Sequence, residues 1–163
     1  MKKVLFIIAS LVLCTLMLAG CGTETPPATK DVVLYDVLSE INTEFFDDGN
    51  NMKLIETSDK LELYYDIAPA DVADFAAEVS KNSATEIDEV VLIKAVDEAA
   101  AKRVAEKLEL RLQAQKDLCA SYSPELLAIA EKCSVTTNGL YVSLIVTENY
   151  DEVNSLYLSL VVG

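Results

Sequence analysis

The sequence predicts an α+β domain with a four-stranded, mostly antiparallel sheet and helices packed largely on one face. Two observations support this prediction: segments with apolar residues at every third or fourth position, and short runs of branched residues that polar connections join in pairs. Their order is helix, strand pair, long helix, short helix, strand pair and terminal element, which is typical of α+β domains. No internal repeat is evident, so residues 31–163 are expected to form a single domain.

The first helix is predicted over residues 32–46, with Asp31 as its N-cap. Its apolar positions fall on one helical face: Val33, Leu34, Val37, Leu38, Ile41 and Phe45. It ends at the turn cluster of residues 47–51, Asp-Asp-Gly-Asn-Asn. The pattern after Met52 is weaker. A short helix capped by Ser58 or Asp59 is expected there, before Pro69 interrupts the chain.

Two strands are predicted over residues 76–80 and 87–96, and the polar residues 81–86 would join them as an antiparallel hairpin. The second strand is apolar on both faces, with Val91, Ile93 and Ala95 on one and Val90, Leu92 and Lys94 on the other. Lys94 interrupts this pattern. It either extends past the sheet edge or pairs with a carboxylate such as Asp88 on the same face.

The clearest element is a long helix from Asp97 to about Ala120, which we expect to pack on the sheet. Asp97 is its predicted N-cap and Glu98 lies in its first turn. The inward stripe consists of Ala101, Val104, Ala105, Leu108, Leu112 and Cys119. Ser123 and Pro124 would begin a further short helix.

The last part of the chain is predicted as a strand pair followed by a terminal element. A strand that begins at Val135, a tight turn at Asn138-Gly139 and a strand over residues 140–147 form the pair. Asn149 or Asp151 can cap a last helix through residue 160. The alternation of Ser-Leu-Tyr-Leu-Ser-Leu, residues 155–160, leaves a strand open as the alternative.

The N-terminal residues have the pattern of an export signal, with Lys2 and Lys3 before an apolar run over residues 4–18. At about 15 residues, this run is shorter than the roughly 20 that a spanning helix needs. Leu18-Ala19-Gly20 lead directly into Cys21, and this pattern resembles the lipobox of bacterial lipoproteins. The resemblance implies that residues 1–20 are a lipoprotein signal peptide and that Cys21 is acylated. A plain signal peptide beside a chance cysteine is the alternative.

Acyl chains on Cys21 would make membrane lipid a partner of the chain and anchor it to the extracytoplasmic face of the cell membrane. Residues 21–30, with Pro26 and Pro27 among threonines, are expected to be a flexible tether. The residues after Cys21 reach at most about 30 Å when fully extended. The folded part would therefore stay close to the membrane.

The chain is strongly acidic, with a formal net charge of −14 and no histidine. Loss of two lysines with the signal would leave about −16 on the mature chain. Such a surface repels nucleic acid, so no nucleic-acid partner is expected, and it favours cations or a basic partner. The alternative is that the acidity only keeps an exported domain soluble.

Two cysteines, Cys119 and Cys133, remain once Cys14 is removed with the signal and Cys21 is lipidated. Export permits a disulfide between them. Both fall on predicted apolar helix faces, where free cysteine behaves as a small hydrophobic residue. The bridge and the pair of free thiols are both left open.

Several segments together resemble one family: "VLSEI" at residues 37–41, "EIDEVVLIKA" at 86–95, "SYSPELL" at 121–127 and "NGLYVSLIV" at 138–146. The family is an uncharacterised group of small lipoproteins of Gram-positive anaerobes, catalogued as domain of unknown function 4358. The resemblance implies an exported, lipid-anchored α+β module without an assigned activity. It carries over no functional residues.

The composition excludes several kinds of chemistry. Without histidine, neither a Ser/His/Asp or Cys/His nucleophile nor a histidine-based zinc site can form. Neither a metal site nor a cofactor is expected, because the 47–51 cluster lacks the ligand spacing of a calcium loop. The composition leaves open a catalytic pair of carboxylates of the kind that glycosidases use. Glu86, Asp88 and Glu89 lie near a strand start, however, and charged clusters there are typical of a solvated edge.

Four residues are candidates for recognition: Lys94, Arg111, Tyr64 and Tyr65. For the tyrosine pair, the alternative is that one ring faces the core and the other faces water. We therefore expect a membrane-anchored, non-enzymatic binding or accessory module for an unknown envelope protein or ligand. The alternative is a carboxylate- or tyrosine-dependent enzyme that acts on a cell-envelope substrate.

Overall fold

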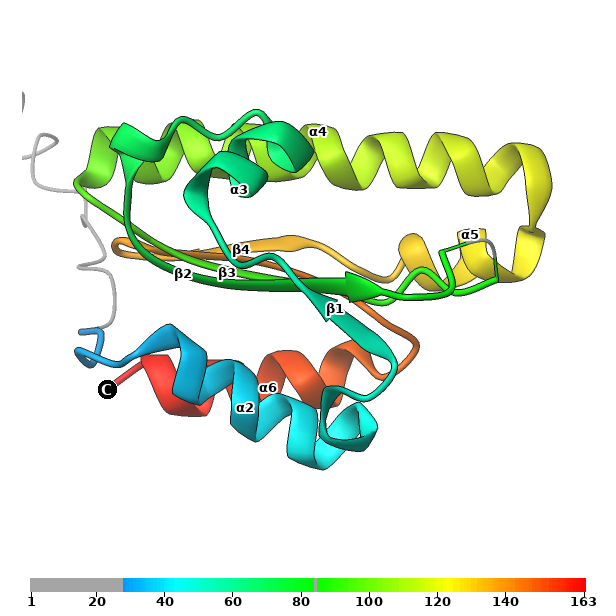
Figure 1. Cartoon of the computed structure of the whole chain (residues 1–163), viewed down its shortest axis with the longest axis horizontal. Coiled ribbons are helices and arrows are strands. Elements are labelled where there is room, and N and C mark those ends of the chain that lie inside the picture. Colours follow the sequence, from blue (N-terminus) through cyan, green and yellow to red (C-terminus); the bar gives the residue numbers. More distant parts are fainter. Residues whose placement is uncertain (1–27, 84) are drawn as a thin grey trace, which may run out of the picture.

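The computed structural model of the chain describes residues 28–83 and 85–163, which form one antiparallel sheet with helices on both of its faces (Figure 1). The predicted lipobox, residues 18–21, lies outside the described residues. The strands are β1 (Met52–Leu54), β2 (Val72–Ser80), β3 (Glu89–Ala95), β4 (Val135–Asn138) and β5 (Tyr141–Val146). The helices are α2 (Leu34–Phe45), α3 (Ser58–Tyr65), α4 (Glu98–Tyr122), α5 (Pro124–Ala130) and α6 (Tyr150–Val161), with short 3₁₀ turns η1 (Asp47–Gly49) and η2 (Pro69–Asp71). The α+β class is confirmed.

The prediction of four strands is wrong, because the sheet has five in the order β1-β2-β3-β5-β4. All of its neighbours pair antiparallel. The additional strand, β1, pairs along the edge of β2 with Met52 opposite Ser80. Three residues are too few to show a period of two, so the sequence pattern gave no signal for this strand.

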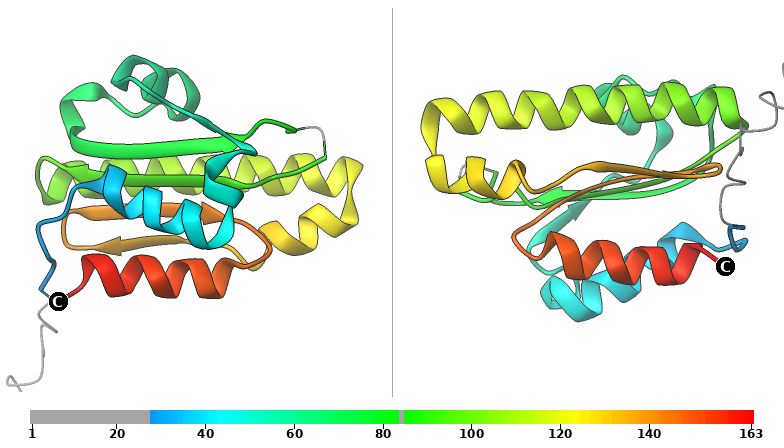
Figure 2. Two further views of the ribbon diagram at one scale, coloured as in Figure 1. Left: turned by 60° about the horizontal axis from the view of Figure 1, so that its bottom comes forward. Right: turned by 180° about the vertical axis from the view of Figure 1, so that it is seen from behind.

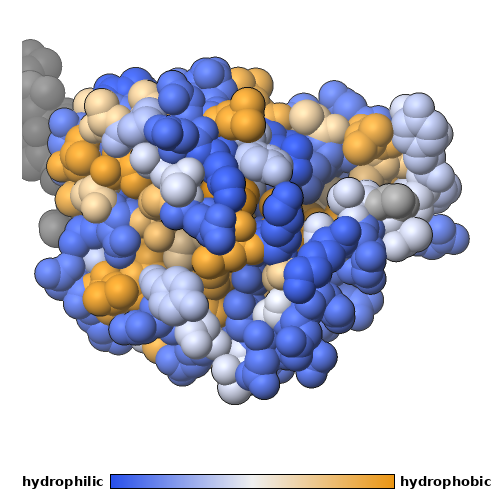
Figure 3. Space-filling model, in the orientation of Figure 1, coloured by the Kyte–Doolittle hydropathy of each residue, from blue (hydrophilic) through white to orange (hydrophobic). Residues whose placement is uncertain are grey.

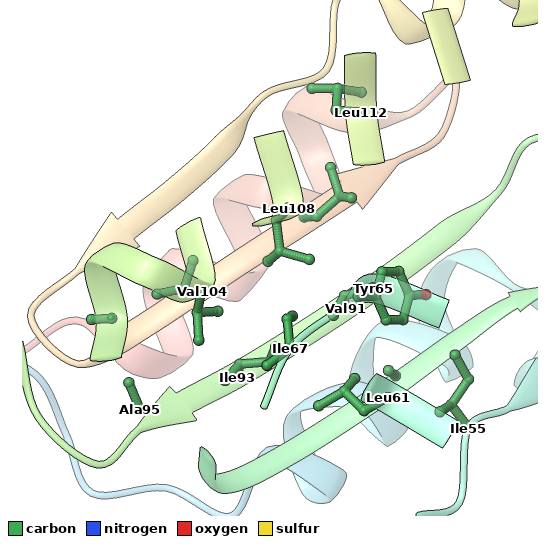
Figure 4. Close-up of a cluster of buried hydrophobic side chains, with 14 of the residues drawn as sticks. Ile55, Leu61, Tyr65, Ile67, Val91, Ile93, Ala95, Val104, Leu108 and Leu112 are labelled. Atoms are coloured by element: carbon green, nitrogen blue, oxygen red, sulfur yellow. The ribbon is translucent and has the colours of Figure 1, made fainter. Parts of the chain in front are cut away.

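The prediction that helices cover largely one face is also wrong. On one face, α3 and α4 cover Val91 and Ile93 of β3, and on the other α2 and α6 cover Val90 and Leu92 (Figure 2). A strand that is apolar on both faces needs cover on both. Figure 4 shows the first of these two cores, where Tyr65 lies beside Val91 and side chains of α4, among them Leu108, lie over the same face of the sheet.

Three helices begin at a residue whose own side chain caps them, and a fourth is capped by a residue distant in the sequence. Thr57, Asp97 and Ser123 cap α3, α4 and α5 through their side chains, of which Asp97 and Ser123 were predicted. Asp31 does not cap α2. Instead, the first helical amide, that of Leu34, donates to the Asp74 carboxylate of β2 at 3.1 Å.

The terminal element is a helix, α6, so the strand alternative for residues 155–160 is wrong. Val153, Tyr157 and Val161 lie four residues apart and are all fully buried against the sheet. Neither Asn149 nor Asp151 caps α6 with its side chain. Within the described residues, no helix combines the length and the apolar character needed to cross a membrane.

The strands and long helices run between two ends of the molecule. The entry end comprises residues 28–33, 68–71, 95–98, 139–140 and 162–163, and the far end comprises residues 46–51, 81–83, 85–88, 123–134 and 147–149 (Figure 1). At the entry end, the Gly163 amide donates a hydrogen bond to the Ala28 carbonyl at 2.7 Å, and Thr29 forms an isolated antiparallel β-bridge with Val162. Since α4 spans 25 residues, it is about 37 Å long and connects the two ends.

Candidate functional site

Two clefts open at the far end, on either side of residues 85–88 in the β2–β3 connection. The α5 cleft has a volume of about 410 Å³ and lies between this connection, α5, the end of α2 and the β5–α6 connection. The α4 cleft has a volume of about 340 Å³ and lies between the same connection and the second half of α4. Glu86, Ile87 and Asp88 line both clefts.

The α5 cleft combines acidic groups with an apolar wall. Its acidic residues are Asp47, Glu86, Asp88 and Glu148, and its apolar residues are Phe45, Phe46, Met52, Ile87, Leu126 and Ile129. Among the described residues, none of these four carboxylates forms an ion pair. A cleft of this kind suits a cationic or basic group attached to an apolar one.

Asp88 is the most perturbed carboxyl group of the α5 cleft. Burial raises its pKa above the ordinary value, and the charges of Glu86 and Glu148 raise it further, while a hydrogen bond with Thr147 works in the opposite direction. The neighbouring Glu86 accepts a hydrogen bond from the Ser80 hydroxyl at 2.6 Å. The connection is therefore held in place by a side chain of β2.

The α4 cleft has a buried ion pair at its base. The Glu89 side chain is only 1% exposed, and Arg111 of α4 donates to both of its oxygens, with Nε at 3.1 and 3.2 Å and Nη2 at 2.9 Å. Gln115, one turn further along α4, donates its amide to the same carboxylate. Glu89 was expected to lie on a solvated edge, and this expectation is wrong.

Tyr65 completes this network from α3. The Arg111 guanidinium lies 5.9 Å from the centre of the Tyr65 ring, which is within cation–π range. Burial raises the pKa of the Tyr65 hydroxyl far above its ordinary value, and the adjoining Glu89 carboxylate raises it further. Burial lowers the pKa of Arg111, but its hydrogen bonds and charge interaction with Glu89 outweigh this effect and raise it. At neutral pH, Tyr65 is therefore neutral and Arg111 is charged.

The structure brings three of the four predicted recognition residues together and places the fourth, Lys94, elsewhere. Arg111 and Tyr65 are in contact, and the Tyr64 ring lies 6.3 Å from the Tyr65 ring with an exposed fraction of 42%. Tyr65 faces the core and Tyr64 faces solvent, as the alternative for this pair anticipated. Lys94 lies on the opposite face of the sheet.

Lys94 pairs with Asp31, and not with Asp88. Its Nζ lies 2.5 Å from an Asp31 carboxylate oxygen and 5.6 Å from the centre of the Tyr141 ring. The side chain therefore fastens the start of the described chain to the sheet. This position is at the entry end, away from both clefts.

Cys119 and Cys133 are both buried and both free thiols. Cys133 lies in the α4-side core, where its thiol donates to the Ile129 carbonyl at 3.3 Å, and Cys119 lines the α4 cleft. Burial raises the pKa of both thiols, so neither is a reactive thiolate at neutral pH.

Glu78 is a buried carboxyl group that the sequence pattern did not single out. It lies in β2 beneath α2, is 3% exposed and accepts a hydrogen bond from the Asn42 amide at 3.0 Å. Burial raises its pKa. The alternation of faces along β2 places Glu78 on the side that packs against α2, and this pattern in the sequence could have identified it as buried. Within residues 28–83 and 85–163, no cluster of acidic or cysteine side chains has the arrangement of a metal site.

The titratable groups at the two clefts differ in how far they are free to exchange protons. Glu89 is saturated by its donors, and Tyr65 is too weak an acid to exchange a proton at neutral pH. Asp88 is the carboxyl group best suited to proton transfer, because its pKa is raised and it lines both clefts.

The chain belongs to the family described as domain of unknown function (DUF4358), whose model matches residues 46–147. This region contains all five strands together with α3, α4 and α5, so it includes most of the lining of both clefts. Helices α2 and α6 lie outside it. No curated protein and no solved structure gives a significant match.

Proposed function

We propose that the protein is a membrane-anchored lipoprotein on the extracytoplasmic face of the cell membrane, like the small lipoproteins of Gram-positive anaerobes that its sequence resembles. In this proposal, Cys21 carries the lipid and residues 1–20 are the signal peptide. The folded domain is a non-enzymatic binding or accessory module. Its clefts hold a basic protein segment or ligand of the cell envelope.

One observation carries this proposal: the clefts lie at the end opposite to the one where the chain enters the domain. Ala28 is bonded to the C-terminal Gly163 at the entry end, whereas Glu86, Ile87 and Asp88 line both clefts at the far end. An anchor that precedes Ala28 would therefore leave the clefts directed away from the membrane. The acidic lining of the α5 cleft favours a basic partner.

The anchor is tested by replacing Cys21. We expect the Cys21→Ser chain, once its signal peptide is removed, to move from the membrane fraction of intact cells to the soluble fraction, because it lacks acyl chains. Cys119→Ser is the matched control and should stay in the membrane fraction. A Cys21→Ser chain that remains membrane-bound, or native protein without acyl mass on Cys21, would contradict the anchor.

The binding role is tested by photo-crosslinking in intact cells. A crosslinking residue at Leu126, which lines the α5 cleft, is compared with one at Leu63, which is 81% exposed on α3 away from both clefts. We expect a specific adduct only from position 126, and its loss with Asp88→Asn plus Glu148→Gln. Equal adducts from both positions, or none from position 126, would count against the proposal.

A second candidate function is a carboxylate-dependent enzyme that acts on a cell-envelope substrate. The raised pKa of Asp88, close to two further carboxylates, favours it. Purified protein would then release fragments from cell-wall material, and Asp88→Asn would abolish the release. Turnover without any crosslinked partner would select this function over the binding module.

A further inference from the structure

The entry end has a surface that the proposed binding role does not use. Its exposed apolar residues are Val33, Ala68, Pro69, Ala70 and Val96, and together with Leu140 we call them the entry face. Val33 is 59% exposed and Val96 is 48% exposed. They belong to connections between elements, where polar residues would be the ordinary choice.

Charge on the entry face is largely balanced. Asp31 pairs with Lys94, and Asp71 accepts two hydrogen bonds from Arg103 at 3.0 and 2.5 Å. Asp97 is engaged as the cap of α4. Lys30 adds a positive charge and Glu98 a negative one. Lys94 and Arg103 lie on neighbouring elements, just outside the entry-end ranges. When they are counted as the partners of Asp31 and Asp71, three bases face four acids at this end.

The far end has the opposite character. Its acidic residues are Asp47, Asp48, Glu86, Asp88, Glu125, Glu131 and Glu148, and its basic residues are Lys81 and Lys132. In Figure 3, the surface over β1 and the end of α2 is mostly hydrophilic. An anionic bilayer would repel the far end more strongly than the entry end.

The chain outside the described domain is short on this side. Only residues 22–27 separate Cys21 from Ala28, and six residues reach at most about 20 Å when fully extended. An acylated Cys21 would hold the entry face at a high effective concentration next to the bilayer. Weak apolar contacts are then sufficient to keep it there.

From the position of Ala28, the exposed valines and the balanced charge, we infer that the entry face rests on the surface of the lipid bilayer and directs the far-end clefts outward. This inference depends on the lipid anchor of the proposed function. Val33 and Val96 insert among the headgroups, while Lys94 and Arg103 neutralise the aspartates that would otherwise be repelled. The protein is then an oriented module, and not a domain that tumbles on a tether.

The absence of tryptophan from the sequence makes this inference testable by fluorescence. Single-tryptophan variants Val33→Trp, Val96→Trp and Leu118→Trp are prepared in the full, lipidated chain and bound to phosphatidylcholine–phosphatidylglycerol vesicles with brominated acyl chains. Leu118 is 61% exposed in the α4 cleft and is the matched control. We expect at least twofold quenching and a blue shift for Val33→Trp and Val96→Trp, and no change for Leu118→Trp.

Flotation and mass analysis of Cys21 separate the two ways in which the inference can fail. A chain that is not acylated or does not float with the vesicles overturns both the anchor and the inference. A chain that floats but shows equal or no quenching at all three positions overturns only the inference. A concentration-dependent blue shift of Val96→Trp without vesicles would assign the entry face to a second copy of the chain and also overturn it. Because Val33→Trp and Val96→Trp change different segments, agreement between them shows that the result does not come from misfolding of one variant.

Discussion

At the entry end, Asp31 and Asp71 each pair with a base, whereas at the far end Glu86, Asp88 and Glu148 line a cleft where no described residue forms an ion pair with them. Pairing lowers the pKa of Asp31 and Asp71, through Lys94 and Arg103 respectively. At the far end, burial and like charges raise the pKa of Asp88. Acidic residues therefore form ion pairs that hold segments together at one end, and at the other end they line a cleft without a described ion-pair partner.

The ion pairs of the molecule differ in burial as well as in place. Arg111 and Glu89, under the α4 cleft, are 34% and 1% exposed, while Lys94 and Asp31 at the entry end are 27% and 89% exposed. A buried carboxylate that loses its partner is costly, but an exposed one is solvated. This contrast predicts that removing the base of each pair has very different effects on the free energy of unfolding.

The largest effect is expected for Arg111→Met. It leaves the Glu89 charge buried without its main partner and should lower the free energy of unfolding by about 3 kcal/mol, the lower end of the range for buried pairs because Arg111 is partly exposed. Urea unfolding measures this change. The matched variant Arg103→Met breaks a less buried pair, in which Arg103 is 54% and Asp71 16% exposed, and should have a smaller effect.

A double substitution sharpens the same comparison. Glu89→Gln combined with Arg111→Met removes both charges and should recover most of the lost stability. If the double variant is as unstable as Arg111→Met alone, packing against Tyr65, and not the unpaired charge, determines the cost. If Arg103→Met is as costly as Arg111→Met, the distinction between the two ends is wrong.

The second prediction concerns the dependence of stability on pH, which should have opposite signs at the two ends. The folded-state pKa of Asp88 lies above its ordinary value of 3.8, so its contribution is complete below pH 3.8 and is lost as the pH rises through the folded-state pKa. The pKa of Asp71 is lowered, so its contribution is present above pH 3.8 and is lost as the pH falls through the folded-state pKa.

Thermal unfolding between pH 2 and 8 tests these signs. Asp88→Asn should remove part of the loss of stability above pH 3.8, by about 1.4 kcal/mol for each unit of the pKa shift. Glu78 has a raised pKa too, so some of the loss will remain until Glu78→Gln is added. Asp71→Asn should change only the acid side of the curve. A curve that Asp88→Asn leaves unaltered would contradict the perturbed carboxyl group.

Much of the fold was predictable because its signals are local. The cap at Asp97 and the stripe of α4 depend on neighbouring residues. The cap is confirmed, and so is most of the stripe, which omitted the buried Ala100 and Gln115. The alternation in β3 correctly separated its two apolar faces. The same alternation argued for helices on both faces, since Val90 and Leu92 need cover as much as Val91 and Ile93 do.

The remaining errors arise where contacts between distant residues decide. The β1 strand, which was missed, exists because it pairs with β2. The last helix was predicted and is confirmed as α6, but contacts of Val153, Tyr157 and Val161 with the sheet were needed to exclude the strand alternative. For the candidate site, Arg111 was singled out as a charged residue beside the helix stripe and Tyr65 as one of an adjacent tyrosine pair. Their shared partner Glu89 was not, because strand register and helix position bring it together with residues more than 20 positions away.

The smallest effects are expected for two turns with left-handed backbone, one at each end. Gly139 at the entry end has φ of 57°, and it is the first of two central residues in the β4–β5 turn, so the Asn138-Gly139 prediction is displaced by one position. A Cβ at Gly139 would lie 3.7 Å from Thr29 Cγ2, an ordinary contact. Gly139→Ala should therefore cost about 1 kcal/mol through backbone strain alone.

At the far end, Asp48 has φ of 54° although it carries a side chain. Asp48→Gly relieves this strain, but the greater freedom of glycine in the unfolded chain offsets part of the gain. We therefore expect a stabilisation of about 0.5 kcal/mol, opposite in sign to Gly139→Ala. Paired urea titrations of the two variants and the parent protein measure both. Destabilisation by Asp48→Gly would mean that its carboxylate holds the turn, so the far-end acids would include a structural one after all.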